Sequence, residues 1–317
     1  MRFLPNHCAK KDYSSLHTDS FGVLVPTRNR VTRLEKLCAS IKSSSLQPHQ
    51  VVIVSSSTEI EATREKELCS DFGFDYVHTS QRGQINQKII GIKQISPSIN
   101  YIVFLDDDTL VGKDMFRVLR DFLASNPKCV GVGAWICSES STPSKRRRNL
   151  PGVITKTGFP RSYQWIRTPC EVQWLNGTSM WRSSVVQEYS HNIPGMTWAV
   201  FEDVYFSTIA RRFGSLWFLP EAKVFLQDSS GEVITRNRMQ FMLFANANYV
   251  LQFHFSTFRF VFFGYLPFLF LIWKNSSLKS SGSGKLSVLL LFDHVRLSLH
   301  LWLDDDPTQY LQKKLVE

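Results

Sequence analysis

The sequence predicts an α/β fold of the Rossmann-like kind, with a mixed, mostly parallel sheet that is covered by helices on both faces. Three observations predict it. Short apolar segments alternate with amphipathic segments through the first hundred residues, which is the pattern of strands joined by crossover helices. The apolar segments are nearly continuous, as strands buried on both faces are. Polar residues follow directly after several of them, where ligands bind in open parallel sheets.

The N-terminal half gives these elements in a regular order. Strands are expected at 21–25, 51–54, 76–77 and 101–105, and helices at 34–41, 59–72 and 84–94. Right-handed crossovers keep such strands parallel, so their carboxyl ends meet at one rim of the sheet. We therefore expect the loop after Val25, the serines after Val54 and the aspartates after Leu105 to lie on that rim.

The second half is less regular and ends in a different composition. Strands are expected at 130–137, 172–181, 217–219 and 222–226, and a helix at 201–213. After residue 236 the chain becomes rich in apolar and aromatic residues. We therefore predict one domain at 20–235 and a C-terminal helical tail at 236–317. This tail either lies in the plane of a membrane surface or packs on the domain.

Composition restricts the partners and the compartment. The net charge of +10 suits an anionic partner. The basic residues are scattered, however, apart from 145–148, so we expect no nucleic-acid binding. The six cysteines form no CxxC pair, and residues 1–11 lack the apolar core of a signal peptide. A cytoplasmic protein is expected, either free or at the cytoplasmic face of the membrane.

Three adjacent aspartates, Asp106, Asp107 and Asp108, follow the most apolar predicted strand. Such carboxylates repel one another, and a divalent cation with oxygen ligands, Mn²⁺ or Mg²⁺, would supply the counter-charge. In an extended chain Asp106 and Asp108 point the same way, and Asp107 points to the opposite side. The alternative is a solvated acidic turn, which we prefer for the similar triplet at 304–306 because no strand end precedes it.

Four segments stand in order along the chain, at 25–30, 83–91, 104–108 and 202–203. Together they resemble family 2 glycosyltransferases of the GT-A fold. The first resembles the strand and loop that hold the nucleotide, and the second resembles the segment that usually reads Arg-Asn-x-Gly. The third resembles the metal-binding Asp-x-Asp motif, and the last resembles the Glu-Asp motif. The resemblance covers about 21–214 and implies an inverting transfer of sugar from a nucleotide donor to a glycan or lipid-linked acceptor.

The resemblance also implies roles for single residues. Asp203 would be the general base that takes the proton of the acceptor hydroxyl, with Glu202 as the alternative. Asp108 and Asp106 would hold the metal ion. The donor would be contacted by Pro26, Thr27, Arg28, Arg30, Ser55, Lys88, Asp106 and Asp107. Gly177 resembles the glycine of a turn near the acceptor, and an ordinary turn is its alternative. Trp198 precedes the base and could stack on an acceptor sugar, although the sequence favours a core tryptophan.

The sequence departs from the family at two of these positions. Serines 55–57 stand where the family usually has an aspartate that contacts the base, and Lys88 stands where it usually has an arginine. Lysine keeps the charge but loses the planar fork. We expect UDP- or dTDP-sugars as donors ahead of GDP-sugars. Two other functions stay open: a nucleotidyltransferase, which would want a glycine-rich phosphate loop that 25–30 lacks, and a non-catalytic nucleotide-sugar-binding protein.

Overall fold

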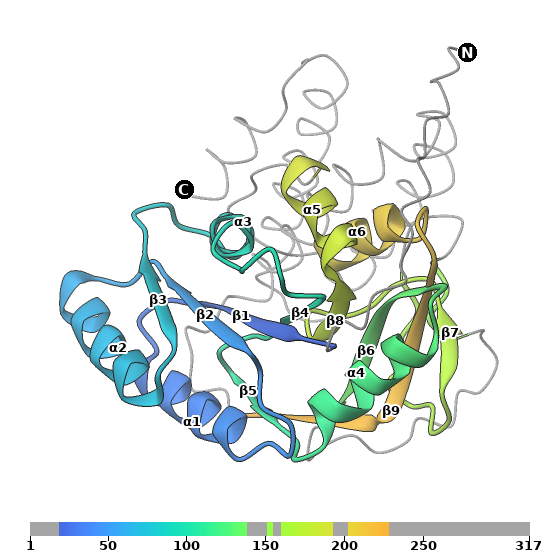
Figure 1. Ribbon diagram of the computed structural model, residues 1–317, viewed down its shortest axis with the longest axis horizontal. Helices are drawn as coiled ribbons and strands as arrows, with labels where there is room; N and C mark the ends of the chain where they lie inside the picture. The colour runs from blue at the N-terminus through green and yellow to red at the C-terminus, as the bar shows by residue number, and fades with distance from the viewer. Residues whose placement is uncertain (1–18, 138–150, 155–159, 193–201, 228–317) are drawn as a thin grey trace, which may run out of the picture.

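The computed structural model describes residues 19–137, 151–154, 160–192 and 202–227 (Figure 1). The predicted tail at 236–317, the basic segment at 145–148 and Trp198 lie outside the described residues. The described helices are α1 (Val31–Lys42), α2 (Glu59–Phe72), α3 (Gln84–Ile92), α4 (Met115–Ser125), α5 (Ser183–Asn192) and α6 (Glu202–Ala210). None of these helices combines the length and the apolar character that a bilayer crossing requires.

The described strands form one mixed sheet. They are β1 (Phe21–Thr27), β2 (Gln50–Ser55), β3 (Asp75–His78), β4 (Tyr101–Phe104), β5 (Thr109–Val111), β6 (Cys129–Cys137), β7 (Cys170–Val172), β8 (Ser179–Arg182) and β9 (Ser215–Leu226). Their order is β3-β2-β1-β4-β8-β6-β9-β5, and β7 pairs with β9. β3, β2, β1 and β4 run parallel, β8 is antiparallel to both of its neighbours, and β6 runs parallel to β9.

Helices cover both faces of the sheet, as the sequence predicts (Figure 1). Strand alternation directs successive side chains into two cores. Val23 and Val25 of β1 pack with buried residues of α1 and α4, whereas Leu24 packs with buried residues of α3, α5 and α6. Gly91 allows α3 to lie close to β1, because a Cβ at this position would collide with Leu24.

The structure differs from the predicted elements in the second half. β5, α4 and α5 occupy stretches to which the sequence patterns assign no element. The two short strands predicted at 217–219 and 222–226 are parts of one strand, β9. Its pairing with β6 jumps from Ala134↔Leu219 to Trp135↔Lys223. Pro220 lies in this jump and has no N–H to donate to a neighbouring strand, which accounts for the break in the apolar pattern.

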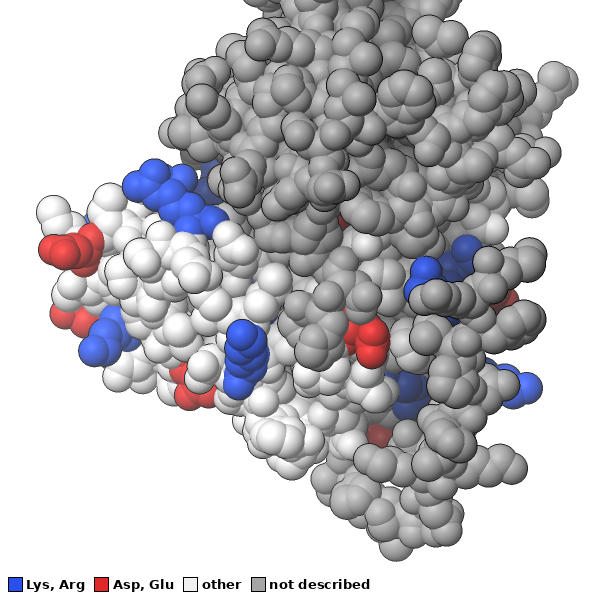
Figure 2. Space-filling view, turned by 90° about the horizontal axis from the view of Figure 1, so that it is seen from above, with Lys and Arg blue, Asp and Glu red and all other residues white. Residues whose placement is uncertain are grey.

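On the face shown in Figure 2, the visible charged residues do not gather into one patch. In Figure 2 the lysine and arginine side chains stand at several separate places and alternate with acidic and uncharged residues. All five described cysteines are free, and Cys38, Cys69 and Cys129 are buried.

Candidate active site

The carboxyl ends of β1, β2 and β4 meet at one rim, which confirms the arrangement expected from the sequence. The parallel registers bring Thr27 beside Ser55 and place Leu24 beside Phe104. The backbone N–H of Ser56 donates to the carbonyl of Thr27 at 3.2 Å, and the loop after β1 is thereby tied to the loop after β2. The aspartate triplet follows β4 directly, so it lies at the same rim.

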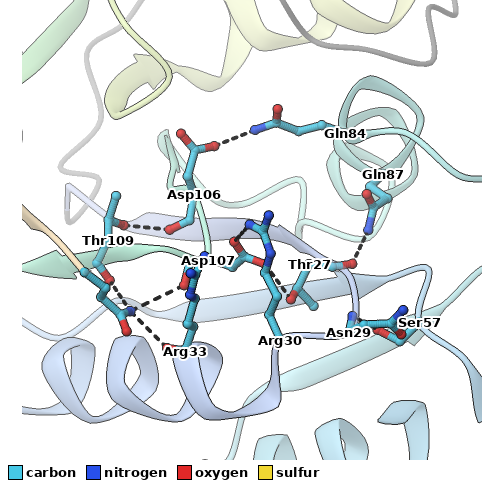
Figure 3. A network of polar contacts seen from close by, with 11 residues as sticks. Thr27, Asn29, Arg30, Arg33, Ser57, Gln84, Gln87, Asp106, Asp107 and Thr109 are labelled. Carbon is cyan, nitrogen blue, oxygen red and sulfur yellow. Dashed lines mark hydrogen bonds and ion pairs between the residues drawn. The ribbon is translucent and has the colours of Figure 1, made fainter. Parts of the chain in front are cut away.

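Asp107 fastens the triplet to the loop after β1. Its carboxylate accepts a hydrogen bond from the Thr27 hydroxyl at 2.8 Å and an ion pair from Arg30 at 2.7 Å (Figure 3). The Asp107 residue is 5% exposed, whereas the Arg30 side chain is 43% exposed. Burial raises the pKa of Asp107, although Arg30 and Thr27 oppose this. Asp107 is therefore engaged within the protein, and a contact with the donor would compete with these bonds.

The other residues of the first loop differ in exposure. Pro26 and Thr27 are buried in β1, and Arg28 is exposed just beyond its end. The buried amide of Gln87 on α3 donates to the carbonyls of Thr27, at 2.6 Å, and of Val54, at 2.7 Å. These two hydrogen bonds fix the ends of β1 and β2 relative to α3. Of these donor-contact candidates, Arg28 and Arg30 are the two with exposed side chains.

Asp106 points toward α3, away from Asp107 (Figure 3). Its carboxylate accepts a hydrogen bond from the Gln84 side chain. An ideal Cβ on Gly177 would lie 3.1 Å from Asp106 Oδ2, so Gly177 stands against the carboxylate. Burial raises the pKa of Asp106 to about 6; Lys88 opposes this, and the nearby carboxylates, with Asp108 first, add to it. Asp106 is thus a partly buried acid, and the carboxylates around it outnumber the one cation, Lys88, that opposes them.

Asp108 is half-buried, and its backbone is anchored from the far end of the chain described here. The N–H of Gln227, just after β9, donates to the carbonyl of Asp108 at 2.8 Å. The Gln227 side chain donates to the carbonyls of Arg33 at 3.0 Å, Thr109 at 3.2 Å and Asp107 at 3.4 Å. Gln227 therefore fixes the backbone of the triplet. No motif in the sequence marks this residue.

Two carboxylates at the rim, those of Asp106 and Asp108, could hold a metal ion together with a substrate. Within the described residues, no group of three or more histidine, cysteine, aspartate and glutamate side chains could hold a metal ion. Asp107 is paired with Arg30, which leaves Asp106 and Asp108 as carboxylate ligands. Mg²⁺ and Mn²⁺ take hard oxygen ligands, and Mg²⁺ in particular is usually held by one or two carboxylates together with substrate phosphates. Asp106 and Asp108 suit that ligand set.

Lys88 forms a buried pair with Glu202. Lys88 Nζ lies 2.9 Å from Glu202 Oε1, and the two residues are 1% and 4% exposed. The hydroxyl of Tyr189 on α5 donates to the same oxygen at 2.5 Å. Burial opposes the charge on Lys88, but the surrounding carboxylates, with Glu202 first, raise its pKa. A direct contact from Lys88 to the donor would require this pair to break. In this structure Lys88 is therefore the ion-pair partner of Glu202.

Asp203 opens α6 beside this pair. One carboxylate oxygen accepts the backbone N–H of Val204 at 2.8 Å. Burial raises the pKa of Asp203 to about 7, and the charge of Glu202 is the next contribution in the same direction. A carboxylate with a pKa near neutrality is suited to accept a proton. Glu202 already accepts two hydrogen bonds at Oε1, so Asp203 is the better placed of the two predicted bases.

The turn around Gly177 is attached to the helix that bears Asp203. The N–H of Leu175 donates to the Ser207 hydroxyl at 2.9 Å, and that hydroxyl donates to the Asp203 carbonyl at 2.6 Å. The N–H of Asn176 is bonded to the buried hydroxyl of Tyr163 at 2.8 Å. Gly177, predicted near the acceptor, is thus brought against Asp106. Trp198, its predicted companion, lies outside the described residues.

Behind the serines after β2 lies a carboxylate that the sequence analysis missed. Glu65 of α2 is fully buried and accepts hydrogen bonds from Ser55 at 2.5 Å, Ser57 at 2.8 Å and Tyr76 at 3.3 Å. Ser55 is itself fully buried, so a contact with a base would require it to release Glu65. Glu65 lies three residues from Ala62 and four from Cys69, both buried. That helical spacing is the signal that could have identified it.

The comparisons with known proteins show the family and the fold of this chain. The family model described as glycosyl transferase family 2 matches residues 22–187, which is more than half of the chain. The search of curated proteins found no match. The match includes the rim, the triplet, Lys88 and Gly177, and it ends before the Glu-Asp pair.

Two similar solved structures show the same fold at low sequence identity. S. aureus TarS, residues 1–349 in complex with UDP-GlcNAc, has a TM-score of 0.53 and 15% identity; the match covers 73% of this chain and 66% of that one. GalNAc-T7 with UDP, GalNAc and Mn²⁺ has a TM-score of 0.56 and 13% identity, over 74% and 48%. The chain thus spans from about half to two thirds of these proteins. The sheet is that of the GT-A fold, and the chain belongs to glycosyl transferase family 2.

Proposed function

We propose that this protein is an inverting glycosyltransferase that moves a sugar from a nucleoside diphosphate to a hydroxyl of a glycan or a lipid-linked acceptor. The observation that supports this most directly is a pair of partly buried acids, Asp106 and Asp203, whose charges act on each other across the site. Asp106 lies at the rim of the parallel strands, and Asp203 lies at the start of α6 with a pKa raised to about 7. The family match supplies the reaction class.

In the proposed reaction Asp203 takes the proton of the acceptor hydroxyl. The acceptor oxygen forms a bond to the anomeric carbon, and the bond from that carbon to the diphosphate breaks. The nucleoside diphosphate leaves with the electron pair, and inversion follows from attack on the opposite face. Glu202 is held by Lys88 and Tyr189, and its charge contributes to the raised pKa of Asp203.

UDP-sugars are the proposed donors, with dTDP-sugars as the alternative. The two similar structures contain UDP-GlcNAc in one case and UDP with GalNAc in the other. The rim of β1 and β2 offers exposed Arg28 and Arg30 to a diphosphate. A cation held by Asp106 and Asp108 would neutralise the charge that develops on the leaving diphosphate. The nucleotidyltransferase alternative has no support from the family match.

Replacing Asp108 by Asn tests the cation site. We expect the affinity for UDP in the presence of Mn²⁺ to fall by at least about tenfold, since a neutral amide is a poorer ligand than a carboxylate. UDP affinity in EDTA should be the same in the variant and the native protein. Isothermal titration calorimetry measures both. Asp121→Asn, an exposed aspartate on α4, is the control. An unchanged Mn²⁺-dependent affinity in Asp108→Asn would remove this residue from the site.

The proposed place of action is the cytoplasm or the cytoplasmic face of the membrane. Free thiols at all five described cysteines support a reducing compartment. The proposal that the tail at 236–317 contacts the membrane rests on the composition of that segment alone. Sedimentation with anionic vesicles of the full chain, compared with a chain ending at residue 235, tests it. Equal binding of the two would contradict the role of the tail.

The general test of the function is a thermal-shift screen of nucleoside diphosphates and sugar nucleotides with Mn²⁺. A ligand that binds the native state raises the midpoint of unfolding, and at a fixed ligand concentration the rise grows with the logarithm of its affinity. We expect uridine compounds to give the largest shifts. No shift with any nucleoside diphosphate or sugar nucleotide would contradict the proposed function.

A further inference from the structure

The turn at 175–178 holds a carboxamide for which the described part of the chain provides no partner. Both polar atoms of the Asn176 side chain, Nδ2 and Oδ1, are buried and form no hydrogen bond with the residues that the structure describes. The hydroxyl of Thr178, two residues on, is in the same condition. Buried side-chain amides almost always find partners, because the loss of hydration is otherwise uncompensated. An amide left with neither donor nor acceptor satisfied indicates that a ligand supplies what is missing.

Hydrogen bonds fix the backbone on both sides of this amide, so the turn cannot easily rearrange to give the amide a partner. The N–H of Asn176 is bonded to Tyr163, and Tyr163 is fully buried. The N–H of Leu175 is bonded to Ser207, which in turn donates to the carbonyl of Asp203. Gly177 stands against the carboxylate of Asp106. Asn176 is therefore connected to the helix of the proposed base on one side and adjoins the proposed donor site on the other.

From this placement we propose that the carboxamide of Asn176 binds the polar substituents of a hexose held between Asp106 and Asp203. The inference rests on the proposed function. A carboxamide offers two N–H donors and one carbonyl acceptor. A 2-acetamido group presents a complementary carbonyl and N–H, and a pair of neighbouring sugar hydroxyls presents both a donor and an acceptor. Asn176 thereby selects a sugar by its substituents, whether that sugar belongs to the donor or to the acceptor.

The test uses Asn176→Leu, which keeps the size of the side chain and removes its hydrogen bonds. Calorimetry with Mn²⁺ measures the affinities for UDP and for UDP-GlcNAc, and then the affinity of the UDP-loaded protein for methyl N-acetylglucosaminide. A loss of about tenfold or more for UDP-GlcNAc, with UDP unchanged, assigns Asn176 to the donor sugar. The same loss for the methyl glycoside alone assigns it to the acceptor. Equal affinities of the variant and the native protein for all three ligands would overturn the proposal.

The stability of the variant gives a second, independent readout. An amide without partners in the free protein does not stabilise the fold, so Asn176→Leu should unfold at the same urea concentration as the native protein or a higher one. Asn126→Ala, at an exposed asparagine after α4, is the control for unrelated effects. A clearly lower midpoint for Asn176→Leu would show that the amide is paired within the protein and would reject the proposal. Failure of the native protein to bind UDP would instead reject the proposed function.

Discussion

Asp203→Asn should reduce the turnover of sugar transfer by roughly 10²–10⁴-fold, because the amide cannot take the proton of the acceptor. The oxygen of Asn can still accept the N–H of Val204, so the start of α6 should be preserved. Donor binding should be unchanged, since Asp203 is proposed to act on the acceptor. Single-turnover kinetics and calorimetry with UDP separate the two effects.

Asp71→Asn, at an exposed aspartate of α2, is the matched control and should leave turnover unchanged. Glu202→Gln is the informative comparison, because Glu202 is the other carboxylate in the first turn of α6. We expect the Glu202 variant to retain part of the activity and the Asp203 variant to lose nearly all of it. Turnover close to native in Asp203→Asn would contradict the assignment of the base.

The same substitution should stabilise the protein at alkaline pH. Burial raises the pKa of Asp203 from its ordinary value to about 7, so the folded state favours the neutral acid. The resulting penalty is absent at a pH below the unfolded pKa of about 4, grows as the pH rises, and is complete above pH 7. Asn has no such penalty. Urea unfolding at pH 8 should therefore show Asp203→Asn to be more stable, by on the order of 2–4 kcal/mol, with little difference at pH 4.

The architecture around β1, β2 and β4 could be predicted because it follows from local pattern. The apolar runs at 21–25, 51–54 and 101–105 are near-continuous, and the residues that end them are the rim of the site. Asp106–Asp107–Asp108 could be found for the same reason, since a carboxylate cluster after a buried strand is unusual. The structure directs two of the three apart: Asp106 points toward α3, and Asp107 points toward Thr27 and Arg30. Asp107 and Asp108 lie in a turn, however, and not in the extended chain that the prediction assumed.

The partners of these residues could not be predicted, because they come from distant parts of the chain. Lys88 meets Glu202 across 114 residues of the chain, and Gln227 reaches the triplet from the end of β9. Lys88 was expected to contact the donor because its position in the sequence resembles a donor-binding segment. Its burial beside Glu202 is a tertiary effect. The sequence alone shows neither that Glu202 lies beside Lys88 nor that Lys88 is buried.

Lys88→Met should destabilise the protein by about 3–5 kcal/mol at pH 8, because it leaves the buried carboxylate of Glu202 without a counter-charge. Urea unfolding at pH 8 measures this loss. Lys93→Met, at an exposed lysine just after α3, removes a charge at the surface and should change the stability little.

The double variant Lys88→Met/Glu202→Gln separates the charge from the packing. With no buried carboxylate left unpaired, much of the stability lost in Lys88→Met should return.

The pH dependence of turnover should move in opposite directions in the two single variants, Lys88→Met and Glu202→Gln. Lys88 lowers the pKa of Asp203 and Glu202 raises it, so Lys88→Met should shift the acid limb of the profile upward and Glu202→Gln should shift it downward. If the acid limb of the pH profile stayed in place in both single variants, the Lys88–Glu202 pair would have no effect on the pKa of Asp203.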